Sequence, residues 1–242
     1  MQLERITVLE NDMPQIGLFT RTITQGDEYE LVKQFVEYYC HQFQRNNKKL
    51  NLAVFIEPRV SSGFPDIVLA SYLPSIVNNW SDERKNLTVN DLKILSHLLL
   101  TRGVNGSHLI SSLKLPEKQT LTSLEKLLDA KLISYRNKCW RPRELRDVFS
   151  IIKLISVEAK INNINRVVEQ SLINTWFASH SYALTNVSKP QNETLKAFSQ
   201  HGIGLYCKKK SFQKILEAKQ ITLPSSYQSL QFNEWIGNNL AV

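Results

Sequence analysis

Apolar and polar residues follow one another with two different periods along this chain of 242 residues. Short, nearly continuous apolar runs predict buried strands, and apolar residues spaced three and four apart predict helices. The strands expected from these patterns are 6–9, 17–20, 51–57, 66–70, 151–160, 182–185 and 202–207. The helices expected outside the middle of the chain are 27–43, 163–179 and 211–219. Strands that alternate with helices predict an α/β fold with a mixed sheet flanked by helices.

The segment 87–143 differs from its surroundings because helical spacing dominates it. A first helix is expected to end at Gly103, since glycine commonly stops a helix. A second helix is expected at 107–113 and a third after Pro116, because proline is tolerated in the first turn of a helix. Residues 131–142 then read as two short strands joined by a basic turn, which predicts a hairpin.

Three helices followed by a basic hairpin resemble the winged helix-turn-helix domain. Residues 124–133, Leu-Glu-Lys-Leu-Leu-Asp-Ala-Lys-Leu-Ile, are similar to the end of its recognition helix and the run into its wing. The resemblance implies duplex DNA as the partner, with the third helix in the major groove and the hairpin on phosphates or in the minor groove. It assigns these contacts to Lys118, Gln119, Thr120, Thr122, Ser123, Arg136, Lys138 and Arg141. Winged helices also serve as protein–protein modules, which is the alternative.

The net charge of +8 is unevenly distributed. Residues 1–83 hold 7 basic and 11 acidic residues, residues 84–147 hold 13 and 6, and residues 148–242 hold 10 and 5. The three parts therefore carry −4, +7 and +5. A clustered basic excess suits a polyanionic partner, because neutralising phosphates releases condensed counterions. The charge thus favours DNA for the middle segment.

Two acids and a lysine stand at the ends of expected strands. Asp66 follows Pro65, and Glu158 and Lys160 lie either side of Ala159. Buried charges are costly unless they pair or bind a metal. Two carboxylates that converge suit a hard cation such as Mg²⁺ or Mn²⁺, and a neighbouring lysine can orient or deprotonate a water molecule that attacks a phosphate.

Pro65-Asp66 and Glu158-Ala159-Lys160 resemble the PD-(D/E)xK motif of the restriction-endonuclease-like nuclease superfamily. The resemblance implies a metal-dependent nuclease in which Asp66 and Glu158 hold the metal ion and Lys160 acts on the water. Gly26 followed by Glu30 resembles the glycine and glutamate of resolvase-like members, which implies that Glu30 supports the metal ion. Gln170 resembles the glutamine that many members place beside the site.

The chain departs from this family in the 92 residues that separate Asp66 from Glu158, because the family usually has a much shorter interval there. Removal of an inserted winged helix restores a short interval. The expected organisation is therefore a discontinuous nuclease-like α/β domain at 1–83 and 148–242, interrupted by a winged-helix insertion at 84–147.

The sequence leaves two functions in competition. One is a Mg²⁺-dependent deoxyribonuclease, an endonuclease with Asp66, Glu158, Lys160 and Gln170 as its catalytic residues. The alternative is a non-catalytic DNA-binding or scaffold subunit of a DNA-processing complex, such as a mobile-element or defence complex, with protein partners.

The lengths of the apolar runs and the spacing of the cysteines indicate where the protein is expected to be located. No apolar run approaches the roughly 20 residues that cross a bilayer, so no membrane partner is expected. Three distant cysteines fit neither a disulfide framework nor a zinc site. The expected location is therefore the cytoplasm or the nucleoid.

Overall fold

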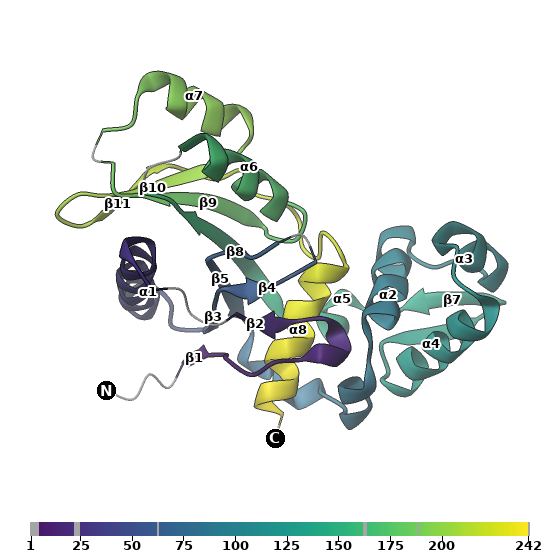
Figure 1. Cartoon of the computed structure of the whole chain (residues 1–242). Helices are drawn as coiled ribbons and strands as arrows, with labels where there is room; N and C mark the ends of the chain where they lie inside the picture. The colour runs from purple at the N-terminus through teal and green to yellow at the C-terminus, as the bar shows by residue number, and fades with distance from the viewer. Residues whose placement is uncertain (1–4, 22–24, 62, 162–163, 188, 242) are drawn as a thin grey trace. The chain divides into compact units, whose positions relative to one another are not determined.

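The computed structural model describes residues 5–21, 25–61, 63–161, 164–187 and 189–241. The chain forms two compact units, each assembled from separate segments (Figure 1). Unit 1 consists of Met1–Asp12, Phe19–Pro74 and Ile151–Ser225. Unit 2 consists of Met13–Leu18, Ser75–Ser150 and Ser226–Val242.

Unit 1 is built on a mixed seven-stranded sheet with the strand order β1-β3-β5-β8-β9-β10-β11. Its strands are β1 (Ile6–Val8), β3 (Asn51–Ile56), β5 (Ile67–Tyr72), β8 (Ile151–Ala159), β9 (His180–Thr185), β10 (Gly204–Lys208) and β11 (Phe212–Leu216). The pairs β1–β3, β8–β9 and β9–β10 are parallel, and β3–β5, β5–β8 and β10–β11 are antiparallel. The predicted α/β class with a mixed sheet is confirmed.

Helices cover both faces of this sheet (Figure 1). Side chains alternate between the faces along a strand, and β9 shows the result. Tyr182 and Leu184 join the core under α1 (Asp27–Asn46). Ala183 joins a second core under α6 (Ile164–Asn174) and α7 (Asn192–Gln200).

Two elements of unit 1 differ from the expectations. Residues 211–219, expected as a helix, form strand β11 because Phe212 and its neighbours pair with β10. The helix expected at 163–179 ends at Asn174. A small additional sheet pairs β2 (Phe19–Thr20) with β4 (Pro58–Arg59).

Unit 2 contains three helices followed by a two-stranded hairpin. The elements are α2 (Val89–Thr101), α3 (Gly106–Leu113), α4 (Glu117–Asp129), β6 (Ile133–Arg136) and β7 (Cys139–Pro142). Thr88 and Asp91 form a capping box that fixes the start of α2. Val104, between α2 and α3, forms a bridge with Trp140 of β7, so the hairpin is tied back to the first helix.

Other segments complete unit 2. They are the 3-10 helices η1 (Pro14–Ile16), η2 (Pro74–Asn79) and η3 (Asp82–Asn86), the short helix α5 (Leu145–Val148), and the C-terminal helix α8 (Tyr227–Leu240), which packs on α2. Residues 13–18, 75–83, 148–150 and 226–242 thus differ from the expected domain bounds, which placed them in the α/β domain.

A buried ion pair explains why α8 belongs to unit 2. Arg84 Nε and Nη2 donate to the two carboxylate oxygens of Glu234 at 3.0 and 2.5 Å, and both side chains are almost fully buried. Arg84 Nη2 also donates to the carbonyl oxygen of Val148 at 3.0 Å. The Trp80 ring lies 3.7 Å from the Arg84 guanidinium. The contacts of Arg84 with Glu234 and Val148 span 150 and 64 residues, which no local sequence pattern encodes.

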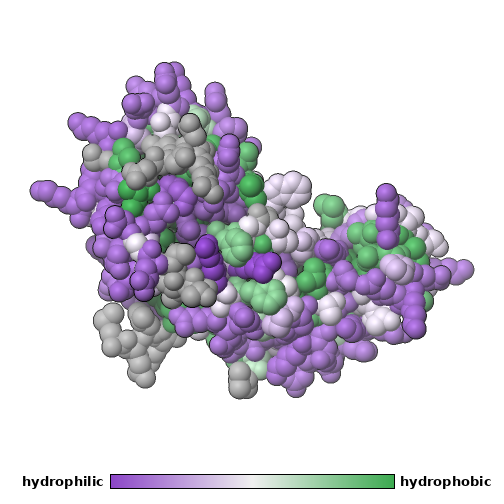
Figure 2. Space-filling model, viewed as in Figure 1, coloured by the Kyte–Doolittle hydropathy of each residue, from purple (hydrophilic) through white to green (hydrophobic). Residues whose placement is uncertain are grey.

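Within the described ranges, every helix is too short or too polar to cross a lipid bilayer. Hydrophilic side chains dominate the face of the molecule seen in Figure 2.

Candidate functional site

Three acidic residues lie in a row across adjacent strands of unit 1. In the antiparallel registers, Ile56 is opposite Ile67, and Ile67 is opposite Val157. The next residues along are Glu57, Asp66 and Glu158, and Glu57 N donates to the carbonyl oxygen of Asp66 at 2.9 Å. Opposed residues of antiparallel strands lie side by side. The register therefore places three carboxylate-bearing residues at one end of the sheet.

Hydrogen bonds hold two of these carboxylates. Ala159 N donates to Asp66 Oδ2 at 2.7 Å, and Asn174 Nδ2 on α6 donates to Glu158 Oε1 at 2.7 Å. Glu158 is only 2% exposed. Its second oxygen, Oε2, is buried and has no hydrogen-bond partner among the described residues. A buried oxygen without a partner is costly, so Glu158 Oε2 is the candidate ligand atom of this site.

Lys160 is positioned by the first helix. Its Nζ lies 2.9 Å from Glu28 Oε2 in the first turn of α1, and its backbone N donates to Leu184 O at 2.9 Å. The Lys160 side chain is 17% exposed and that of Glu28 is 48% exposed. The ammonium group is thus fixed at the border of the site, in reach of water.

Burial and mutual repulsion raise the pKa values of the paired acids. Burial, with Glu28 and Glu57 nearby, raises the pKa of Asp66 to about 6, although the Ala159 N–H and Lys160 oppose the shift. Burial and the charge of Asp66 raise the pKa of Glu158 to about 8, against the opposing effects of Asn174 and Lys160. The two carboxyls repel as anions, and a cation between them would favour their ionised forms.

The structure brings together three of the four expected catalytic residues, Asp66, Glu158 and Lys160. Gln170 lies on α6 one turn before Asn174, and its Oε1 is buried without a hydrogen-bond partner among the described residues. The amide that contacts the cluster is that of Asn174. Sequence reasoning missed Asn174 because its role depends on how α6 lies on the sheet.

Glu30 is placed differently from the expectation. It lines a separate pocket with Gln34 and Lys208, whereas Glu28 contacts Lys160 and influences both Asp66 and Glu158. Glu28 and Glu30 are two residues apart on a helix and therefore point in different directions. The place of Glu57 at the end of the expected strand 51–57 left two interpretations open, a residue of the site or a simple strand-end acid; the structure places it next to Asp66.

The carboxylate oxygens of Asp66 and Glu158 are suitable ligands for a hard divalent cation, but they are only two residues. Carboxylate oxygens are the ligands that Mg²⁺ and Mn²⁺ prefer, and the unpartnered Glu158 Oε2 is one such donor. Within the described ranges, no three His, Cys, Asp or Glu side chains converge as a ready metal-binding group. Mg²⁺ commonly uses one or two carboxylates and completes its shell with water and substrate phosphate oxygens. Asp66 and Glu158 satisfy that smaller requirement.

Two arginines and an aromatic residue of unit 1 contact one another, and the aromatic residue is close to Asp66 in the sequence. The guanidinium of Arg21 lies 5.6 Å from the centre of the Phe64 ring, and that of Arg59 lies 5.8 Å from it. Phe64 is 45% exposed and comes two residues before Asp66. Exposed arginines next to an exposed ring suit the phosphates and bases of a nucleic acid.

The candidate DNA-binding residues of unit 2 divide into two groups. Six of them are at least partly exposed: Lys118, Gln119, Thr122, Arg136, Lys138 and Arg141. Thr120 and Ser123 are 1% and 4% exposed, so their expected place on the outer face of the helix is wrong. They lie on the side of α4 that carries the buried Leu124 and Leu127, and Thr120 Oγ1 donates to Pro116 O at 3.1 Å.

The hairpin presents its basic residues on a tight turn. Asn137 and Lys138 have positive φ angles of 52° and 60°, which is the conformation of a two-residue type I′ turn. The Tyr135 and Trp140 rings pair across the two strands with centroids 4.5 Å apart. Arg136 and Lys138 are therefore held at the exposed tip of an ordered hairpin.

Comparisons with protein-family models, with curated proteins and with solved structures found no match for this chain.

Proposed function

We propose that this chain is a metal-dependent DNA endonuclease, with a restriction-endonuclease-like unit 1 and a winged-helix unit 2. The observation that carries the proposal is the meeting of Asp66, Glu158 and Lys160 at one end of adjacent strands, with Glu158 Oε2 buried and without a partner among the described residues. Two carboxylates beside a lysine are suited to hydrolysis of a phosphodiester bond.

Unit 2 supports DNA as the substrate. Its order of three helices and a hairpin, with the bridge from Val104 to Trp140, is similar to that of a winged helix. In this proposal Lys118, Gln119 and Thr122 face the major groove, because α4 exposes them. The hairpin residues Arg136, Lys138 and Arg141 contact the phosphate backbone.

Each residue of the acidic site then has a role. Asp66 and Glu158 would hold Mg²⁺ or Mn²⁺, which when bound supplies positive charge that stabilises the phosphate in the transition state. Asn174 fixes one oxygen of Glu158 and leaves the other for binding. Lys160 positions the attacking water and moves its proton, and Glu28 holds the Lys160 ammonium in place. Arg21 and Arg59 contact the DNA backbone near the site.

The raised pKa values fit this assignment. Without a cation, the pair Asp66 and Glu158 holds a proton near neutral pH, since the pKa of each is above its ordinary value. A divalent cation requires ionised carboxylates, so its binding releases that proton. Affinity for the metal is therefore expected to rise with pH through this range.

Cleavage of supercoiled plasmid tests the proposal. We expect nicking with Mg²⁺ or Mn²⁺ that EDTA abolishes, and loss of nicking in Asp66→Asn and Lys160→Ala. Asp82→Asn and Lys33→Ala are matched controls, because both residues are exposed and neither influences the pKa of Asp66 or Glu158; they should cut like the native chain. Nicking that persists in Asp66→Asn and Lys160→Ala would overturn the assignment of the site.

A non-catalytic DNA-binding subunit is the second candidate. It is favoured by the hydrogen bond that occupies Asp66 Oδ2 and by the finding that no ready group of three metal-ligand side chains occurs within the described ranges. This candidate predicts salt-sensitive duplex binding without cleavage under any metal, and binding that Asp66→Asn leaves unchanged. Protein partners in a DNA-processing complex would then supply the chemistry.

A further inference from the structure

A pocket of about 250 Å³ lies in unit 1, away from the acidic row. It is enclosed by the C-terminal half of α1 and by β8, β10 and β11. Lys153 and Glu158 occupy odd and even positions of β8, so they lie on opposite faces of the sheet. The pocket is therefore a separate feature on the α1 face.

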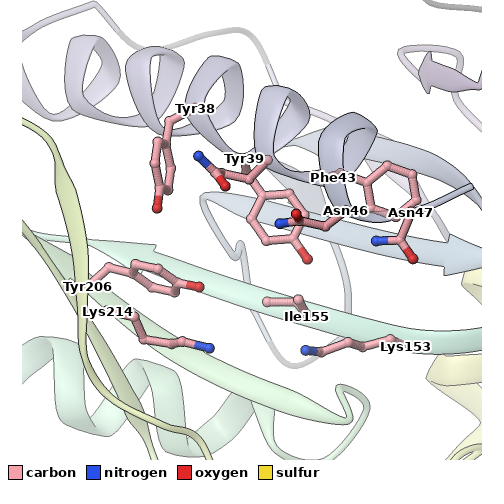
Figure 3. A pocket seen from close by; sticks show the side chains of 10 residues that line it. Tyr38, Tyr39, Phe43, Asn46, Asn47, Lys153, Ile155, Tyr206 and Lys214 are labelled. Carbon is pink, nitrogen blue, oxygen red and sulfur yellow. The ribbon is translucent and has the colours of Figure 1, made fainter.

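The polar ends of the lining side chains converge in this pocket. Figure 3 shows the ammonium groups of Lys153 and Lys214 pointing toward one another below Tyr39, with the hydroxyl of Tyr206 directed to the same space. The carboxamide of Asn46 lies beside the Tyr39 ring, and that of Asn47 lies near Phe43. Two cations, phenol hydroxyls and amides together provide hydrogen-bond donors for an anion.

Lys214 forms an ion pair, whereas Lys153 forms none with any residue that the structure describes. Lys214 Nζ lies 2.5 Å from Glu217 Oε2. Lys153 is half-buried and has no hydrogen bond or ion pair with any described residue, although it feels the charge of Glu217. Burial lowers its pKa, and the nearby Lys214 adds to this effect. A bound anion would relieve the repulsion between the two ammonium groups and replace the lost hydration of Lys153.

The hydroxyls remain donors at physiological pH. Burial raises the pKa of Tyr39 to about 12, with Cys40 and Glu217 adding to the shift, and burial also raises the pKa of Tyr206. Both phenols are therefore neutral and able to donate a proton in a hydrogen bond. The rings beside them provide flat apolar surface on which a heterocycle can stack.

We propose that this pocket binds a nucleoside monophosphate, with its phosphate between Lys153 and Lys214 and its base among the tyrosines and carboxamides of α1. The volume is below the 300–1,000 Å³ that is usual for drug-sized ligands, which favours a compact ligand. Carboxamides suit the donor and acceptor edges of a base. The proposal does not depend on nuclease activity, because the pocket shares no residue with the acidic site.

Calorimetric titration of the full chain with deoxyadenosine monophosphate, in EDTA, tests this inference. EDTA removes divalent cations, so the nucleotide cannot bind at the acidic site through a metal ion. We expect one molecule bound per chain, and binding that is at least about tenfold weaker for deoxyadenosine, which lacks the phosphate. Equal affinity for the nucleoside and the nucleotide would overturn the proposal, as would no binding of either.

Two lysine variants and one control locate the site. Lys153→Gln and Lys214→Gln should each weaken binding of the nucleotide about tenfold or more, because each removes a charge-assisted hydrogen bond. Lys33→Gln removes the same charge from the exposed side of α1 and should bind like the native chain. Equal affinity in all three variants would overturn the proposal. Asp66→Asn should bind normally, so failure of the nuclease proposal and failure of this one are distinguishable.

Discussion

Replacement of Glu158 by glutamine should make the protein more stable at alkaline pH when divalent cations are absent. Burial and the repulsion from Asp66 raise the pKa of Glu158 from 4.5 to about 8. A carboxyl with a raised pKa binds its proton more tightly in the folded state than in the unfolded state. Its favourable contribution is therefore fully present below about pH 4.5 and is lost as the pH rises through about 8. Glutamine keeps an oxygen for Asn174 and has no proton to lose.

The size of the effect follows from the pKa. Each pH unit between the unfolded and folded pKa values corresponds to about 1.36 kcal/mol, so the change from 4.5 to about 8 sets an upper limit of roughly 5 kcal/mol. Relaxation and water entry reduce such values in buried sites. We expect Glu158→Gln to raise the free energy of unfolding by about 2 kcal/mol at pH 9 and by close to zero at pH 4.

Hydrogen exchange in urea provides the assay. The chain has two compact units, so a signal from the whole molecule would mix their transitions. Exchange of the amides of β8, followed by mass spectrometry at several pH values, reports on unit 1. Glu37→Gln is the matched control, because Glu37 is exposed on α1 and has no part in the acidic row; its effect should remain within about 0.5 kcal/mol. An unchanged stability of Glu158→Gln at pH 9 would refute the reasoning.

Two further predictions concern unit 2. Arg84→Ala should lower the free energy of unfolding of unit 2 by about 3–5 kcal/mol, because it leaves the buried Glu234 carboxylate without its partner. Hydrogen exchange of the α8 amides in urea measures this, and a loss below about 1 kcal/mol would contradict the role of the pair. Arg136→Ala and Lys138→Ala should weaken duplex binding about equally for all DNA sequences and lower its logarithmic salt slope by about 1 each. Arg146→Ala, on α5 and paired with Glu144, should leave the slope measured by fluorescence anisotropy unchanged.

The sequence predicted those parts of the fold that depend on local pattern. The apolar runs at 51–57 and 151–160 form β3 and β8, since short runs rich in β-branched residues are typical of strands buried on both faces of a sheet. The segment 211–219 was predicted incorrectly because Phe212, Ile215 and Leu216 also have helical spacing. Its pairing with β10 is a tertiary contact that overrides such a weak local preference.

The candidate site could be predicted only to the level of motifs. Asp66, Glu158 and Lys160 are adjacent to apolar runs that define their strands, and strand register brings them together. The choice between Glu28 and Glu30 depends on the rotation of α1 about its axis, which is set by packing against the sheet. For α4 the information was present in the sequence: Thr120 and Ser123 share the spacing of Leu124 and Leu127, which placed them on the buried face.

The separated segments of unit 2 have a consequence for synthesis of the chain. Its first part, residues 13–18, leaves the ribosome long before its last, residues 226–242. Until α8 emerges, Arg84 has no Glu234 to pair with, and the surface of α2 that α8 covers stays bare. Domains usually fold as units while the nascent chain grows, but this one must wait for residues 226–242. A released chain truncated after residue 225 should therefore resist limited proteolysis in unit 1 and be readily cut in unit 2.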